Sequence, residues 1–237
     1  PLCRAQIASL VLDAALRMDA GSRMPLARFI HLCKLESYIL DVLARPRGQS
    51  PVVLETCATL AGLFGMQGAL PHLPRLLEHR VAAVAFSASL AMLRLKPSAV
   101  PIVWARAPVQ RFSKAALLTL LKAVPSCHVD QLVRRRLDKS DAKGAAQLLS
   151  AWGQLPGRAA VRYASDLLDQ PECEGWLLCA ALRMQDDVSQ IGRIRPFLEH
   201  DRWAVRLQAL HAVSRLGFAA DIEQLKPLQD NANWWVS

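Results

Sequence analysis

The sequence predicts an all-α protein that is built from repeated helical hairpins. Leu and Ala dominate a chain that is 52% hydrophobic and only 6% aromatic, and this composition favours helix over strand. Apolar residues recur at the spacing of an amphipathic helix. Helix openings return at steps of 30 or 31 residues, which is typical of stacked two-helix units because one hairpin cannot bury its apolar stripe alone.

The repeat frame is clearest between Glu199 and Gly217, where one helix closes and a second opens at Trp203. Comparable openings of this inner helix occur near residues 51, 81, 111, 142, 173 and 203, with a truncated one at 234. The seventh position of the inner helices is Cys57, Ser87, Leu117, Leu148, Cys179 and Ala209, and the tenth is Leu60, Leu90, Leu120, Ala151, Leu182 and Ala212. Both columns are apolar or small, so we expect them to form the core.

The last complete inner helix carries a recognisable pattern. Residues 205–217 read Val-Arg-x-x-Ala-x-x-Ala-Val-x-x-Leu-Gly, which resembles the second helix of a HEAT repeat. The resemblance covers about residues 50–237 and implies a right-handed α-α superhelix, a HEAT-repeat solenoid of about 13 or 14 helices. The opening at Trp234 implies a further unit or cap beyond the sequence given.

The first 50 residues depart from the repeat period, so we expect them to form an N-terminal capping hairpin. Its helices are predicted over residues 4–19 and 25–44. Ser50 and Pro51 are predicted to cap and open the first inner helix. Pro71 and Pro74 fall in the first outer helix, which we expect to bend. A short or distorted helix is predicted over residues 99–108.

The positive charge is unevenly distributed along the chain. The net charge is +9, and residues 1–118 carry 14 Lys and Arg against 6 Asp and Glu, whereas residues 119–237 carry 15 against 14. Cations near one end suit an anionic membrane surface, a nucleic-acid backbone or an acidic protein; alternatively they keep a Leu-rich solenoid soluble. The densest basic run, Arg134, Arg135 and Arg136, is a candidate contact for an anionic surface or else a solvated helix face.

The inner helices of a HEAT stack generally line its concave side. Positions two, six, nine and thirteen of the frame are largely apolar in the first three units and polar in the last three. Such a surface suits an amphipathic helix or an extended peptide, unless neighbouring helices cover its apolar end. The candidate partner-binding residues are Thr56, Thr59, Phe86, Ser89, Phe112, Thr119, Lys143, Gln147, Gln154, Gln185, Gln208, His211 and Arg215.

The cysteines and histidines predict neither a metal site nor a cofactor. Cys57 and Cys179 share a core column, and the six cysteines include no C-x-x-C pair, which favours a reducing compartment. His79 and His200 each follow Glu, whereas HEAT-like iron hydroxylases carry His-Glu pairs. We therefore expect no metal and no cofactor, and a cytoplasmic location. No apolar run is long enough to span a membrane, so a tether to the inner membrane would lie outside this sequence.

The chain offers no nucleophile set, Gly-rich phosphate loop or poised carboxylate pair. We therefore expect a non-enzymatic scaffold or adaptor that binds a protein helix or extended peptide and no small-molecule substrate, in a bacterial membrane-associated assembly. The alternative is a HEAT-like DNA-binding protein or alkylpurine DNA glycosylase, a class with similar size, basic charge and concave tryptophans. Packing explains three of the tryptophans: Trp152 lies at a core position, and Trp203 and Trp234 occupy the same position in successive repeats. A hydroxylase-like or bilin-lyase-like enzyme would instead hold a metal or chromophore.

Overall fold

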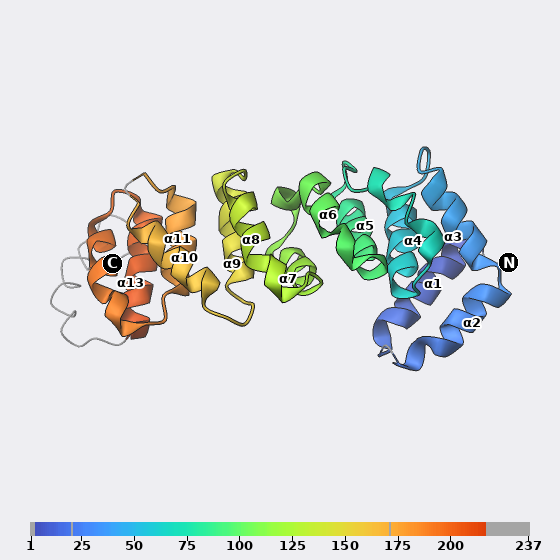
Figure 1. Ribbon diagram of the computed structural model, residues 1–237, viewed down its shortest axis with the longest axis horizontal. Coiled ribbons are helices and arrows are strands. Elements are labelled where there is room, and N and C mark those ends of the chain that lie inside the picture. Colours follow the sequence, from blue (N-terminus) through green and yellow to red (C-terminus); the bar gives the residue numbers. More distant parts are fainter. Residues whose placement is uncertain (1–2, 20, 171, 217–237) are drawn as a thin grey trace. The chain divides into compact units, whose positions relative to one another are not determined.

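The computed structural model describes residues 3–19, 21–170 and 172–216, and every regular element within them is helical. The prediction of an all-α protein is therefore confirmed for this part of the chain (Figure 1). Thirteen α-helices are joined by turns and short 3-10 segments. The chain divides into two compact units, residues 1–112 with 122–126 and residues 113–121 with 127–237.

The first unit contains six α-helices. They are α1 (Arg4–Arg17), α2 (Met24–Leu32), α3 (Leu35–Ala44), α4 (Pro51–Leu63), α5 (Ala82–Leu95) and α6 (Val100–Arg106). Helices α3, α4 and α5 pack against one another in chain order, and α1 packs against α4. Ser50 caps α4 as predicted, because its hydroxyl oxygen accepts a hydrogen bond from the Val53 N–H at 3.3 Å and Pro51 is the first helical residue.

The prediction of one long helix over residues 25–44 is wrong. The helix ends at Leu32, and Lys34 adopts a left-handed conformation with φ 52° before α3 begins. The two halves bury different residues, Ile30 in α2 and mainly Ile39 and Leu43 in α3. The chain turns between them because one straight helix would not direct both sets of side chains into the core.

The first outer segment is also less regular than predicted. Residues 67–75 form two 3-10 turns, η2 (Gln67–Ala69) and η3 (Leu73–Arg75), in place of a bent α-helix. Pro71 and Pro74 lack the N–H groups that an α-helix would need here. Leu73 remains fully buried, so the segment keeps its apolar contact with the core without regular helical geometry. The predicted distortion around residues 99–108 is confirmed, since α6 is short and lies between η4 (Pro97–Ala99) and η5 (Val109–Arg111).

A glycine sets the spacing between α4 and α5. A Cβ atom added to Gly62 would lie 2.7 Å from the Cα and 2.9 Å from the Cβ of Ala91. Real Cβ contacts are longer, so only glycine fits at this position. The two backbones approach closely as a result, and the side chains around them are excluded from solvent.

The second unit contains the remaining helices. They are α7 (Lys114–Lys122), α8 (Ser126–Leu137), α9 (Ala142–Trp152), α10 (Ala159–Leu168), α11 (Gly175–Met184), α12 (Ile191–Ile194) and α13 (Trp203–Leu216), with η6 (Val188–Gln190) and η7 (Arg195–Glu199) on either side of α12. Helices α9, α11 and α13 pack in chain order, and α10 packs against α11.

Four inner helices begin within one residue of the predicted positions, and two begin later. Helix α7 starts at Lys114 because Phe112 is extended and the Ser113 hydroxyl accepts a hydrogen bond from the Ala116 N–H at 3.2 Å. Helix α11 starts at Gly175 after an extended Glu174. The opening predicted at Trp234 lies outside the described residues.

Both predicted core columns are buried. All six residues at the seventh position are buried, from Cys57 to Ala209, and at the tenth position only Leu90 is partly exposed. The burial confirms that the apolar columns read from the sequence face inward. Within the described residues, every helix is too short or too polar to cross a lipid bilayer.

Candidate partner-binding groove

Two adjoining hollows lie on the inner helices of the second unit. The first has a volume of about 500 Å³, is lined mainly by α9 and α11, and brings together the predicted residues Lys143, Gln147 and Gln154. The second has a volume of about 790 Å³ and lies along α11 and α13, where it includes Gln208. We call them the α9–α11 groove and the α11–α13 groove. Both include Trp176 and Arg183 of α11.

Helical spacing explains why the polar residues of α9 share one side of the groove. Lys143, Gln147 and Ser150 are four and three residues apart, so they lie on one face of the helix. Leu148 and Leu149 lie on the buried side of the same helix. On α11, Trp176 and Arg183 are seven residues apart and therefore also project from a common face.

The α9–α11 groove is positively charged. Lys114, Lys143 and Arg183 line it, and among the described lining residues Asp186 is the single carboxylate. Asp186 already forms an ion pair with Arg158 at 3.7 Å. The groove therefore presents an excess of cations to whatever enters it, and a low-dielectric wall strengthens their field.

Trp176 and Trp203 provide apolar surface in the α11–α13 groove. Their side chains are 59% and 43% exposed. The prediction that packing accounts for Trp203 is therefore wrong, because α13 presents this residue to solvent at its first turn. The packing account is supported for Trp152, which is 3% exposed and donates its ring N–H to the Asp130 carboxylate at 3.0 Å.

Sequence reasoning missed three residues that line the groove, Lys114, Trp176 and Arg183. The repeat frame, in which this inner helix opens at residue 173, places Trp176 outside positions two, six, nine and thirteen. Its seven-residue spacing from Arg183 was the available signal, because that spacing returns to the same face after two helical turns.

Four predicted binding residues are wrong, because they are buried in the core. Thr56, Ser89, Phe112 and Gln185 are at most 7% exposed. The Ser89 hydroxyl donates to the Ala85 carbonyl at 2.7 Å, and the Phe112 ring packs edge-on against Phe86 with centroids 5.8 Å apart. Neighbouring helices cover these side chains. The sequence left this open as an alternative for the first three units, where the surface is apolar.

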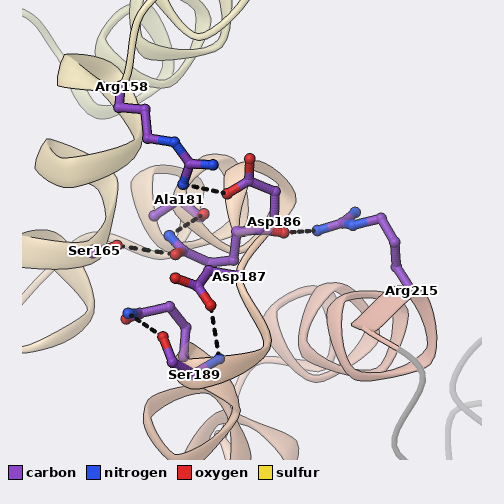
Figure 2. A network of polar contacts seen from close by, with 9 residues as sticks. Arg158, Ser165, Ala181, Asp186, Asp187, Ser189 and Arg215 are labelled. Atoms are coloured by element: carbon purple, nitrogen blue, oxygen red, sulfur yellow. Dashed lines mark hydrogen bonds and ion pairs between the residues drawn. The ribbon is translucent and has the colours of Figure 1, made fainter.

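Arg215, Ser165 and Ala181 take part in a network of polar contacts at the end of α11 (Figure 2), and Gln185 connects all three. The Gln185 amide donates to the Ala181 carbonyl and accepts from the Ser165 hydroxyl, each at 3.0 Å. The Arg215 guanidinium donates to the backbone carbonyls of Gln185 at 2.7 Å and Leu182 at 3.3 Å. These carbonyls lie at the last turn of α11, where the Leu182 carbonyl also accepts the Gln185 N–H at 3.4 Å, so Arg215 caps the negative end of α11. Its guanidinium is engaged with the fold, and its contact with a partner stays a prediction.

The other predicted residues are spread over both units. Gln208 accepts a hydrogen bond from the Arg183 guanidinium at 2.9 Å, so it joins the two grooves. Thr119 and His211 are exposed, while Thr59 and Phe86 are partly buried. The structure therefore concentrates the predicted polar residues Lys143, Gln147, Gln154 and Gln208 at two adjoining hollows and leaves the others apart.

The three consecutive arginines of α8 do not share one exposed face. The Arg134 guanidinium lies 5.5 Å from the centre of the Tyr163 ring, a cation–π distance. Arg135 is exposed, whereas Arg136 is partly buried and burial lowers its pKa. The helical rotation of 100° per residue separates the three charges, so at most two of them share a face, as the sequence indicates, and their contact with an anionic surface stays a prediction.

Comparisons with known proteins do not assign a role to this site. No protein-family model matches the chain, and neither does any curated protein or solved structure at a significant level. Within the described residues, no three His, Cys, Asp or Glu side chains are grouped as a metal ion would require.

Proposed function

We propose that this chain is a non-enzymatic scaffold of the HEAT-repeat type, whose α9–α11 groove binds an acidic helical or extended segment of a partner protein. In this proposal residues 1–50 form the capping hairpin and residues 51–237 form a right-handed superhelix of repeats. The burial of both apolar columns supports the repeat frame. The N-terminal excess of positive charge supports a place in a bacterial membrane-associated assembly on the cytoplasmic side.

One observation carries the choice of partner. Lys143, Gln147 and Gln154 meet in a hollow that also contains Lys114 and Arg183. Cations attract the carboxylates of an approaching segment and orient it, while amide side chains can hydrogen-bond its exposed polar groups. Side chains at helical spacing along the groove match the spacing of anchors on a bound helix.

A charge-reversal experiment tests the proposal. Two libraries of amphipathic peptides, one acidic and one basic, are screened against the chain, and affinities are measured by fluorescence anisotropy. We expect acidic peptides to bind and the Lys143→Glu, Arg183→Glu double variant to weaken them at least about 10-fold. The matched control is Lys139→Glu with Arg162→Glu, because both residues are exposed in the second unit and neither lines the groove.

Two results would overturn the proposal. One is preferential binding of the basic peptides, because it contradicts the charge of the groove. The other is an equal loss of affinity in both double variants, which assigns binding to the overall charge of the unit. In each case circular dichroism establishes that the variants fold.

A DNA-binding protein is the second candidate, favoured by the exposed tryptophans of the α11–α13 groove. Trp176 and Trp203 line it together with Arg202 and Arg206. Exposed aromatic rings in a basic groove can stack with the bases of single-stranded nucleic acid. This candidate, including its base-excising form, requires salt-sensitive retardation of labelled single-stranded or duplex DNA that the Trp176→Ala variant loses. Unchanged mobility at low salt removes it.

A further inference from the structure

Exposed apolar residues gather at the start of the first unit. Ten large hydrophobic side chains are exposed among the described residues, and five of them lie between Leu10 and Leu32. Three of the five belong to α2, which contains only nine residues. A helix of a soluble protein normally turns such residues inward, so the exposed side of α2 requires an explanation.

The exposed side of α2 carries three apolar residues and one cation. Met24, Arg28 and Leu32 are four residues apart and therefore lie above one another on the helix. Leu32 is 79% exposed, Met24 is 67% exposed, and Phe29 beside them is 42% exposed. Ile30, on the opposite side, is the buried residue of this helix. We call Met24, Arg28, Phe29 and Leu32 the α2 outer face.

Cations outnumber carboxylates around this face, although the exposed carboxylates Asp19 and Glu36 flank it. Residues 20–35 contain no Asp or Glu and include Arg23, Arg28 and Lys34. The Arg23 guanidinium donates to the Ala15 and Met18 carbonyls, each at 3.0 Å, so it caps the end of α1. Arg28 and Lys34 are exposed. A surface that accepts this side of the molecule must therefore accept apolar side chains and carry negative charge.

An anionic lipid bilayer has both properties. Helices that lie in the bilayer interface insert apolar residues such as Phe and Leu among the acyl chains, while Lys and Arg extend toward the phosphates. We infer that the α2 outer face binds the headgroup region of an anionic membrane, with Arg28 and Lys34 at the lipid phosphates. This inference does not rest on the α9–α11 groove, which belongs to the other unit.

Cys33 allows the contact to be observed directly. It follows Leu32, is exposed, and can carry an environment-sensitive fluorophore. Cys3, Cys127 and Cys173 are replaced by Ser, while Cys57 and Cys179 are buried and stay unreactive. Adding phosphatidylglycerol-containing vesicles to the full chain should shift the emission to shorter wavelength, and phosphatidylcholine vesicles should not. A fluorophore on Cys127, with Cys33 replaced instead, should show no shift.

Matched variants separate the α2 outer face from the general charge of the chain. Met24→Gln with Leu32→Gln should weaken vesicle binding about 10-fold or more, because it removes the inserting side chains. Arg28→Glu with Lys34→Glu should do the same through the lost phosphate contacts. The controls are Val52→Gln with Ile102→Gln for exposed apolar residues and Arg80→Glu with Lys96→Glu for charge.

Three outcomes would overturn the inference. The first is no emission shift with anionic vesicles at low salt. The second is an equal loss of binding in the α2 variants and their controls, which assigns retention to unspecific electrostatics. The third is an emission shift that depends on protein concentration without vesicles, which identifies the face as a contact between copies of the chain.

Discussion

Cys57 links the repeat pattern to a measurable pKa. It occupies the seventh position of the first inner helix and is fully buried in α4. Burial raises the pKa of its thiol to about 12, because the thiolate cannot be hydrated there. In the unfolded chain the thiol ionises near its ordinary pKa of 9.0. Its contribution to stability is therefore complete below about pH 9 and is lost as the pH rises from about 9 toward about 12.

We expect this thiol to steepen alkaline destabilisation. One proton held by the folded state and released on unfolding lowers the free energy of unfolding by about 1.4 kcal/mol per pH unit within that window. Urea titrations at several pH values between 8 and 11 should show a shallower decline for Cys57→Ala than for the parent chain. Cys33→Ala, at an exposed position, should keep the parent slope. Equal slopes for all three proteins would refute the assignment.

Trp176 should be the principal anchor for a segment bound in the groove. It is shared by both hollows and is 59% exposed, so it can bury a large area when a partner covers it. Trp176→Ala should weaken the selected acidic peptides by about 2 kcal/mol, roughly 30-fold. Its thermal midpoint should change little, because the side chain is exposed. Ile102→Ala is the control, and an equal loss of affinity there would contradict the role of Trp176.

At the scale of single helices, Gly62 fixes the distance between α4 and α5. Gly62→Ala adds a methyl group that would meet the Ala91 backbone. Alanine is the better helix former by about 1 kcal/mol, but overpacking against backbone costs more, so we expect a net destabilisation of about 1–3 kcal/mol. Chemical denaturation measures it. Gly192→Ala in α12 is the matched control, because a Cβ there meets nothing within 4 Å and should stabilise.

The cap on α11 should make Arg215 more important than its exposure indicates. Its guanidinium satisfies two carbonyls at the carboxyl end of the helix. Arg215→Ala should cost about 1 kcal/mol in the free energy of unfolding. Arg158→Ala should cost less than about 0.5 kcal/mol, since it breaks only an exposed ion pair at 3.7 Å. Equal costs would show that the carbonyl contacts of Arg215 contribute nothing specific.

Helix periodicity explains which features of these elements were predictable. Core positions such as Leu148 and Cys179 repeat with the helical period, so the sequence alone indicates that they are buried. The break at Lys34 leaves no such trace, because a lysine with positive φ follows no apolar pattern. Thr56 and Ser89 were misplaced for a related reason. Their burial depends on how closely another helix approaches, and periodicity within one helix does not report that distance.

At the scale of the whole molecule, a stack of repeats should transmit a defect mainly to its neighbours. Leu148→Ala empties a fully buried position in α9 and should cost about 2–5 kcal/mol. In hydrogen exchange, α9 and α11 should lose the most protection and α13 less, because in the proposed stack each repeat contacts only the next. Leu10→Ala, at an exposed residue, should change nothing. An equal loss of protection from α3 to α13 would exclude the solenoid.

The site was only partly predictable from the whole sequence. The frame correctly grouped Lys143 and Gln147, which share one face of α9, with Gln154, which lies in the turn after that helix. It could not show that Trp176 faces the same hollow, since that depends on how α9 and α11 rotate against each other when they pack. The period of the sequence therefore identifies the polar face of each helix. The rotation of the packed helices about their axes decides which of these faces line a common groove.

The left-handed turn at Lys34 has a consequence for insertions and deletions. Each residue added to or removed from the joint between α2 and α3 would change the direction and rotation of α2 relative to the helix that follows, because the left-handed backbone at Lys34 sets this turn. Met24 and Leu32 would then aim elsewhere with their chemistry unchanged. Homologues that share this surface should therefore vary the identity of residues 33 and 34 but keep their number.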